Sequence, residues 1–383
     1  MSITPFARPA PAPIDLPALL DEIRARREDF EKLTYVPLDM VGKLQRIGVY
    51  RAFVPRELGG DALSPAAFME LIEAISAADA STGWVASFGV SSTYLAALPR
   101  ETFEHIYRAD PDTVFAGAIF PPQPAERTPA GFRVRGRWPY CSGCMGASLI
   151  GAGIKVDEAG SGGLPRMVVM PRAAVSIKHT WDTVGLAATG SHDIVADGVE
   201  VDEAWSFVRG APSQREEPIF RYPSMALAAQ VLAVVGLGAA REALDHIHGE
   251  ALGAASITGA PSLGARAYVQ AEIGRAEARL RGARAFFYDT VGEAWESVLA
   301  GDEVGQALRV RLRLCATQAA SESAEVARAA FRLGGASAIA RGHPLVRCML
   351  DAAAVAQHAF LGLGTFTSAG AGLAGEKTPP GYP

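Results

Sequence analysis

The chain has 383 residues, of which 49% are hydrophobic and 20% are charged, and its net charge at pH 7 is -5. This length and composition predict a globular protein with a large buried core and room for two or three domains, and they exclude general disorder. The acidic balance, without a Lys/Arg-rich block, argues against nucleic acid as a partner.

Targeting and compartment signals are weak. The start, MSITPFARPAPAPIDLPALL, lacks a basic segment followed by an apolar core, so we expect no secretory signal. We also expect no membrane, because no apolar run approaches the ~20 residues that span a bilayer. The 4 cysteines in so long a chain do not make a disulfide framework, and a cytoplasmic location is the simplest expectation.

The first zone, residues 1–112, is predicted to be helical. In LSPAAFMELIEAISAADAS, Ser64 is a suitable N-cap and Pro65 suits the first helical position. The apolar side chains that follow recur at helical spacing and indicate one buried face; they are Phe68, Leu71, Ile72 and Ile75.

The second zone, residues 113–215, changes period. VFAGAIF, GFRVRGRW, ASLIGAGIKV, RMVVMPRAAVSI and DIVADGVEV are short β-rich segments separated by turn formers such as Asp197-Gly198. No pattern of helix length interrupts them, so we predict a small antiparallel sheet or barrel.

The third zone, residues 216–383, returns to long helices rich in Ala, Leu and Arg. We expect these helices at about 224–249, 264–299, 303–333 and 344–363. The order helical, β, helical does not alternate strand with helix, which argues against a doubly wound parallel sheet. The sequence therefore predicts a mainly α member of the α+β class, divided into 1–112, 113–215 and 216–383.

The stretch RWPYCSGC contains Cys141-x-x-Cys144 around Ser142. A redox pair needs its first thiolate at a helix N-terminus, whereas MGASLIGAGIKV predicts a turn and a strand. A zinc site needs two further ligands, and Cys315 and Cys348 stand singly in predicted helices. We therefore favour packing for both thiols and leave redox chemistry as a minor alternative.

Two other patterns remain ambiguous from the residues alone. GLGAAR at Gly236–Arg241 is an incomplete dinucleotide fingerprint without a preceding strand, so close helix packing is the better interpretation. His358 lies near an apolar helical stripe, which is typical of a core residue but also suits a general acid or base. The other histidines predict no metal site.

The order and spacing of six motifs resemble the acyl-CoA dehydrogenase superfamily. Within it, the chain is most similar to the oxygenase components of two-component flavin-dependent monooxygenases, which hydroxylate aromatic compounds. The resemblance covers nearly the whole chain and rests on FVPRELGG (53–60), STGWVASFGV (81–90), GRWPYCSGCMGAS (136–148), VGLAATGSHDIVADGVEV (184–201), RLGGASAI (332–339) and HPLVRCMLDAAAVAQH (343–358).

This resemblance implies an N-terminal helical domain, a middle β-barrel or sheet domain and a C-terminal four-helix bundle. It places the isoalloxazine ring of a flavin against the strand end and makes Ser142 and His358 the expected catalytic residues. The implied flavin-binding residues are Tyr140, Cys141, Ser142, Gly143, Thr189, Gly190, Ser191, Gly334 and Gly335. The implied substrate-binding residues are Trp84, Ser91 and Ser92, and no metal is expected.

The expected activity is hydroxylation of an indole-like or phenolic small molecule through a flavin C4a-hydroperoxide. The expected cofactor is reduced flavin, FMN or FAD, and the expected partners are O2, a small aromatic substrate and a separate NAD(P)H-dependent flavin reductase. A homotetramer, or a homodimer, is expected because the family's paired glycines often reach the flavin of a neighbouring subunit.

Two departures from the family pattern bear on the substrate. Related phenol hydroxylases carry a histidine shortly after GWV, where this chain has Ser91 and Ser92, so a ring that needs no deprotonation becomes more plausible. The family's Arg-Asp pair in the last helix is Leu350-Asp351 here.

The main alternative is an acyl-CoA dehydrogenase with bound FAD, for which Glu242 or Glu250 would have to supply the base. A non-catalytic flavin-binding relative is a third reading.

Overall fold

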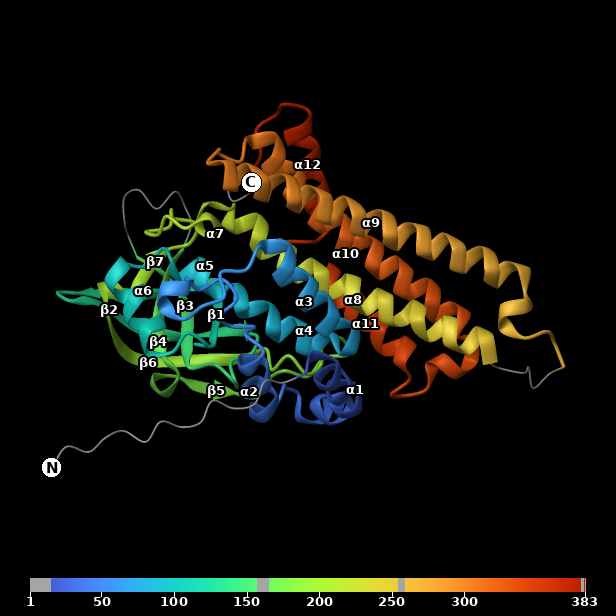
Figure 1. The fold of residues 1–383 in the computed structure, drawn as a ribbon. Coiled ribbons are helices and arrows are strands. Elements are labelled where there is room, and N and C mark those ends of the chain that lie inside the picture. Colours follow the sequence, from blue (N-terminus) through green and yellow to red (C-terminus); the bar gives the residue numbers. More distant parts are fainter. Residues whose placement is uncertain (1–14, 157–164, 254–258, 380–381, 383) are drawn as a thin grey trace.

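The computed structural model describes residues 15–156, 165–253, 259–379 and 382, and its first part is helical (Figure 1). Ser64 accepts a hydrogen bond from the Ala67 N–H at 3.2 Å, and Pro65 starts the helix, which confirms the predicted cap. The N-terminal helices are α1 (Leu16–Leu33), α2 (Leu38–Arg46), α3 (Pro65–Ala78), α4 (Ala80–Ser87), α5 (Ser91–Leu95) and α6 (Arg100–Ala109).

The strands of the described chain form one seven-stranded sheet in the order β5-β6-β2-β1-β3-β4-β7. Their bounds are β1 (Phe115–Thr128), β2 (Gly131–Cys141), β3 (Leu149–Lys155), β4 (Arg166–Pro171), β5 (Ser176–Lys178), β6 (His192–Asp202) and β7 (Ser206–Val208). The expectation of a purely antiparallel sheet is wrong, because β1 and β3 pair in parallel. Strand β1 uses its first part against β3 and its last residues, Ala125–Thr128, against β2.

Long helices make up the third part. Their bounds are α7 (Pro218–Arg221), α8 (Ser224–Gly253), α9 (Ala267–Ala300), α10 (Gln306–Leu333), α11 (Pro344–Ala356) and α12 (Gly364–Leu373). The predicted helix over 344–363 is too long, since α11 ends at Ala356 and His358 lies in the turn that follows. The apolar pattern continues through this turn because Phe360 and Leu361 also pack on the core.

Helix α8 corrects the expectation that the chain lacks a membrane-length apolar segment. Its Ser224–Glu250 stretch is long and apolar enough to cross a bilayer, but 83% of the apolar window is buried inside the fold. Burial on all sides is typical of the central helix of a large core. Gly236–Arg241 lies inside this helix, as predicted.

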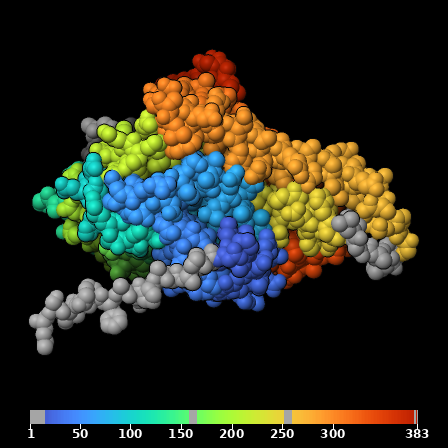
Figure 2. Space-filling view, in the orientation of Figure 1, coloured from blue at the N-terminus to red at the C-terminus, as the bar shows by residue number. Residues whose placement is uncertain are grey.

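The sheet lies at one end of the molecule and α8, α9 and α10 run away from it side by side (Figure 1). The N-terminal helices lie between the sheet and the long helices on the face that Figure 2 shows. Helix α8 packs against α3, α4, α10 and α11. This arrangement brings α4, the end of β2, the segment 184–191 before β6 and the end of α11 together.

Candidate active site

Four polar side chains form a continuous row at the junction of the sheet and the helices. The Trp84 Nε1–H donates to Ser142 Oγ at 3.2 Å, and Ser142 Oγ lies 2.7 Å from Ser191 Oγ. Ser191 Oγ lies 2.7 Å from Thr189 Oγ1, which in turn donates to the Leu186 carbonyl at 3.0 Å. All four side chains are buried. The structure therefore brings together the predicted residues of α4, the β2 end and the 184–191 segment.

The direction of these hydrogen bonds follows from their two ends. A hydroxyl has one proton to donate and two lone pairs that accept. The Thr189 hydroxyl reaches the Leu186 carbonyl, which also accepts from the Trp181 Nε1–H at 3.0 Å. With the Thr189 proton on this carbonyl, Ser191 donates to Thr189 and Ser142 donates to Ser191. Ser142 already accepts from Trp84, so in this arrangement it presents one remaining lone pair, and no proton, to a ligand.

The strand end beside Ser142 has an unusual backbone and an exposed aromatic surface. Tyr140 has φ of +62° and Gly143 has φ of +74°, both in the left-handed region. The Tyr140 side chain is 69% exposed, and its ring lies 6.3 Å from that of Trp181, centroid to centroid. Val184, at the start of the neighbouring segment, is 81% exposed. Apolar surface is therefore exposed next to the buried polar row, at the strand end that carries Ser142.

The 184–191 segment is held from both sides by helices. The Leu186 N–H donates to Asp351 Oδ1 on α11 at 2.6 Å, and the Ala188 N–H donates to Ser81 Oγ on α4 at 3.2 Å. The backbone passes so close to α11 that a Cβ on Gly185 would lie 2.4 Å from the Leu350 carbonyl oxygen. Leu186 itself has φ of +50°. Sequence reasoning missed this role of Asp351, because the contact joins residues far apart in the chain.

Asp351 lies in an unfavourable place for a charge. Burial, followed by the nearby Asp79 carboxylate, raises its pKa to about 7. Glu31 raises it further, while the Leu186 N–H and the Arg347 guanidinium act in the opposite direction. Arg347 stands one turn before Asp351 and forms an ion pair with Glu31 at 2.5 Å. Position 350, where the family pattern has an arginine, is a leucine here, and Arg347 offsets the charge of Asp351 only in part.

His358 completes the row on the helical side. Its ring lies edge-on to Trp84, with 5.6 Å between centroids, and its Nδ1 accepts from the Phe360 N–H at 3.2 Å. Neutral His358 therefore carries its proton on Nε2. Burial, and secondly the charge of Arg313, lowers its pKa to about 4. At neutral pH this imidazole is an uncharged donor through Nε2 and does not supply a proton as imidazolium.

The remaining predicted residues divide into two groups. Ser91 Oγ donates to the Phe88 carbonyl at 2.5 Å, whereas Ser92 Oγ is buried and has no partner among the residues described. Gly334 packs on Leu345, at the start of α11, while His358 follows the other end of that helix. Since α11 is about 20 Å long, Gly334 and Gly335 are not part of the same constellation within one chain.

The thiols of RWPYCSGC are free and buried. The Cys144 Sγ donates to the Gly190 carbonyl at 3.3 Å, on the same segment as Ser191. The hydrogen bond between the two thiols, together with burial, raises the pKa of Cys141, and the same hydrogen bond lowers the pKa of Cys144, whose Sγ is buried against the Gly190 carbonyl. The packing interpretation of both cysteines is consistent with this environment.

A cluster that the histidine spacing did not predict lies at the far end of α8. One side-chain atom from each of His246, Glu250 and His343 lies within 4.8 Å of the others. His343 Nδ1, however, accepts from the Leu345 N–H at 3.2 Å, so neutral His343 keeps its proton on Nε2, the atom that faces Glu250. A protonated nitrogen is a donor rather than a metal ligand. Within this cluster Glu250 is hydrogen-bonded to His246 at 3.1 Å, while His343 Nε2 lies 3.9 Å from it, and the absence of a metal stays a prediction.

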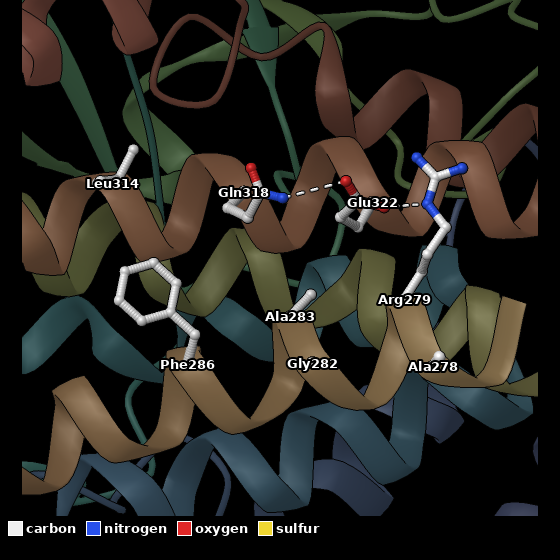
Figure 3. A pocket seen from close by; sticks show the side chains of 8 residues that line it. All are labelled: Ala278, Arg279, Gly282, Ala283, Phe286, Leu314, Gln318 and Glu322. Carbon is white, nitrogen blue, oxygen red and sulfur yellow. Dashed lines mark hydrogen bonds and ion pairs between the residues drawn. The ribbon is translucent and has the colours of Figure 1, made fainter. Parts of the chain in front are cut away.

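A groove of about 430 Å³ lies elsewhere, between α9 and α10 (Figure 3). Phe286 of α9 points toward α10, and Leu314, Arg279, Glu322 and Gln318 also line the groove. None of the predicted site residues lines this groove.

Comparisons with known proteins place the chain among flavin-dependent enzymes. Residues 19–100 match the acyl-CoA dehydrogenase N-terminal domain and residues 230–362 match the C-terminal domain. The chain is 52% identical to the indole-3-acetate monooxygenase of Pseudomonas putida, over 95% of this chain and 94% of that protein. It is 48% identical to the indole-3-acetate monooxygenase of Acinetobacter baumannii, over 96% of each. The crystal structure of 3-HSA hydroxylase from Rhodococcus sp. RHA1 superposes with a TM-score of 0.88 at 26% identity, covering 96% of this chain and 97% of that one.

The buried carboxyl of Asp351 predicts a pH dependence of stability. Its pKa is about 7 in the folded protein and about 3.9 in the unfolded chain, so the folded state binds the proton more tightly. The Asp351 contribution to the unfolding free energy therefore falls as pH rises between these values. Asp351→Asn removes this ionisation. The unfolding free energy of the variant, minus that of the wild type, should therefore rise by about 2–3 kcal/mol between about pH 5 and pH 8.

Urea unfolding at the two pH values measures this difference. Asp39→Asn is the matched control, because Arg26 lowers the pKa of Asp39, so this carboxyl is ionised in both the folded and the unfolded protein throughout the measured range. Its difference from the wild type should therefore stay constant between the two pH values. A pH-independent difference for Asp351→Asn would contradict the electrostatic account.

Proposed function

The chain belongs to the acyl-CoA dehydrogenase superfamily and, within it, to the flavin-dependent oxygenase components of two-component monooxygenases, and we propose that its substrate is an indole that carries an acidic side chain, such as indole-3-acetate. The high identity to two indole-3-acetate monooxygenases over almost the full chain supports this substrate. The observation that carries the site assignment is the buried row of Trp84, Ser142, Ser191 and Thr189 at a strand end where the Tyr140 ring is exposed.

The residues at the strand end fit a reduced flavin. Reduced isoalloxazine is a planar ring whose N5 carries a proton, so it needs an apolar surface and a hydrogen-bond acceptor. Tyr140, Trp181 and Val184 provide the surface, and Ser142 Oγ provides the acceptor. When bound there, reduced FMN or FAD would supply the two electrons that activate O2, so that one oxygen atom could be inserted into the substrate and the other released as water.

Ser142 holds the N5–H in this proposal. Its own proton is committed to Ser191, and Trp84 fills one of its lone pairs. Oxidised flavin has a lone pair at N5 in place of the proton, and this lone pair would be repelled by the free lone pair of Ser142 Oγ. The site therefore favours the reduced cofactor over the oxidised one, as expected for a protein that receives reduced flavin from a separate reductase.

His358 acts as a neutral hydrogen-bond donor in this proposal. Its Nε2–H remains available because Nδ1 accepts from the Phe360 N–H. A donor of this kind stabilises the oxygen atoms that are transferred and disfavours their loss as hydrogen peroxide. Because its pKa is about 4, His358 keeps this state across the neutral range.

Trp84, Ser91 and Ser92 are the proposed substrate contacts. Trp84 is buried and contacts both Ser142, the proposed partner of the flavin, and His358, the proposed hydrogen-bond donor. Neither serine is a base of the kind that deprotonates a phenol, and Ser91 already donates to a carbonyl. An indole ring is electron-rich without deprotonation and suits this lining.

A second copy of the chain is proposed to complete the site, in a homotetramer or a homodimer. Gly334 and Gly335 lie at the far end of α11 from His358 and are assigned to the phosphate-bearing tail of a neighbour's flavin. Gly335 has φ of +63°, and a Cβ placed there would meet nothing within 4 Å. Ile339, in the short helix over Gly335–Ile339, is 73% exposed. A glycine backbone open to its surroundings allows the close approach of a phosphate.

The acyl-CoA dehydrogenase alternative needs a free carboxylate base near the flavin. Glu242 forms an ion pair with Arg27 at 3.2 Å, and Glu250 is hydrogen-bonded to His246 at 3.1 Å. Asp351 accepts from the Leu186 backbone. All three acids are engaged elsewhere, which favours the monooxygenase.

A direct test of the function uses chemically reduced flavin. The protein is mixed anaerobically with reduced FMN or FAD and indole-3-acetate, then exposed to O2 while absorbance is followed by stopped flow. We expect a transient flavin–oxygen adduct and a hydroxylated indole. Prompt reoxidation with no adduct and no product would contradict the proposal, and reduction of bound oxidised flavin by an acyl-CoA would establish the alternative.

His358→Ala should uncouple the reaction. Loss of the Nε2–H donor removes about 1.5 kcal/mol of stabilisation, so product formed per flavin oxidised should fall about tenfold while hydrogen peroxide rises. Product by chromatography and peroxide by a peroxidase assay measure the two. Unchanged coupling would remove His358 from the mechanism.

Ser142→Ala should weaken binding of reduced flavin about tenfold, because it removes the only proposed acceptor for N5–H. The matched control is Cys144→Ala, two residues along the same turn, which removes a buried thiol without touching the hydroxyl row. Anaerobic fluorescence titration measures both affinities. Equal losses in the two variants would mean that Ser142 acts only through packing.

A further inference from the structure

Arg313, on α10, is a buried cation without a carboxylate partner in the described part of the chain. Its side chain is almost fully buried, at 3% exposure for the residue. Its Nη1 and Nη2 donate to the carbonyls of Met225 and Phe360 at the long distances of 3.5 and 3.4 Å, and its Nε has no partner there. Burial lowers its pKa, the direction expected when a charge is poorly compensated.

A second buried arginine has its positive charge balanced by neighbouring carboxylates. Arg215 is similarly buried, with 3% of its side chain exposed, and it forms ion pairs with Glu57, Glu104 and Glu217. Removing a charge from water costs several kcal/mol unless an opposite charge and good hydrogen bonds replace the solvent. The surroundings of Arg215 meet that requirement, whereas the described residues around Arg313 supply no carboxylate.

The position of Arg313 relates this free charge to the proposed active site. Its guanidinium carbon lies 5.3 Å from the ring centroid of Phe360, and the Phe360 centroid lies 5.2 Å from that of His358. His358 in turn lies 5.6 Å from Trp84, which donates to Ser142. A chain of contacts thus runs from the Ser142 hydroxyl, through the rings of Trp84, His358 and Phe360, to the Arg313 guanidinium, which has no carboxylate partner among the described residues.

We propose that Arg313 binds the carboxylate of the aromatic substrate, an inference that rests on the proposed function. Arg313 would then make the site selective for aryl acids over neutral aromatic compounds. A carboxylate supplies the negative charge and the acceptors that the guanidinium lacks, in a geometry that arginine recognises well. The aromatic ring of the same molecule would lie against Phe360, His358 and Trp84. The Tyr382 ring, 4.8 Å from the guanidinium carbon on another side, and its unpartnered hydroxyl leave room for one more hydrogen bond.

Binding of the acid has a further consequence for His358. Burial lowers the pKa of His358 first, and the charge of Arg313 lowers it further. A carboxylate paired with Arg313 cancels that second contribution. The pKa of His358 should therefore rise on binding of an acid and stay unchanged on binding of its neutral isostere.

The experiment compares indole-3-acetate with indole-3-acetamide, which has nearly the same shape and no charge. Both are tested with the wild type, Arg313→Met, Arg313→Lys and Arg209→Met. Arg209 is the matched control, because its buried guanidinium lies 4.2 Å over the Tyr94 ring and takes no part in the row of contacts described above. The measurements are kcat/KM for each compound and the calorimetric Kd of each ligand.

Arg313→Met should lower kcat/KM for the acid about 10- to 100-fold relative to the amide, mainly through KM, the range expected for hydrogen bonds to a charged group. Arg313→Lys should retain part of the preference, and Arg209→Met should leave the ratio of acid to amide unchanged. An equal loss for both compounds, or no loss for either, would overturn the assignment. If the wild type hydroxylates neither compound, the proposed function fails, while the two Kd values still test Arg313.

Discussion

The contact between the Thr189 hydroxyl and the Leu186 carbonyl orients the hydroxyl row that ends at Ser142. With the Thr189 proton on this carbonyl, Ser191 donates to Thr189 and Ser142 donates to Ser191. Trp84 donates at the other end, so Ser142 has a lone pair to offer and no proton. A hydroxyl on its own suits either redox state of a flavin, and the preference for reduced flavin comes from its neighbours.

This row depends on elements that are distant in the sequence. The 184–191 segment carries two of its four side chains, Thr189 and Ser191, and α4 and α11 hold that segment through Ser81 and Asp351. Asp351 is buried beside Asp79, so it positions the segment at a cost in charge burial. The region around the proposed cofactor is thus less favourable to folding than an apolar core would be, which is common where a ligand contributes to the finished site.

The sequence predicted the succession of helical, β and helical zones and the Ser64 cap, because both depend on local periodicity and capping chemistry. It missed the parallel pairing of β1 and β3 and the end of α11 at Ala356, since these are decided by long-range packing. The candidate site came from the family resemblance, not from spacing. The orientation of the hydrogen bonds, the contact of Asp351 with Leu186 and the unpaired state of Arg313 all require coordinates, because each joins residues that no local pattern connects.

The central claim is that a polarised hydroxyl and a neutral imidazole direct oxygen from O2 onto an indole ring. The most direct measurement is the fate of isotopically heavy O2 in a single turnover of the wild-type protein with reduced flavin and indole-3-acetate. The account predicts one heavy oxygen atom in each product molecule and nearly one product per flavin oxidised. Product oxygen derived from water, or flavin oxidation that yields only heavy hydrogen peroxide, would contradict it.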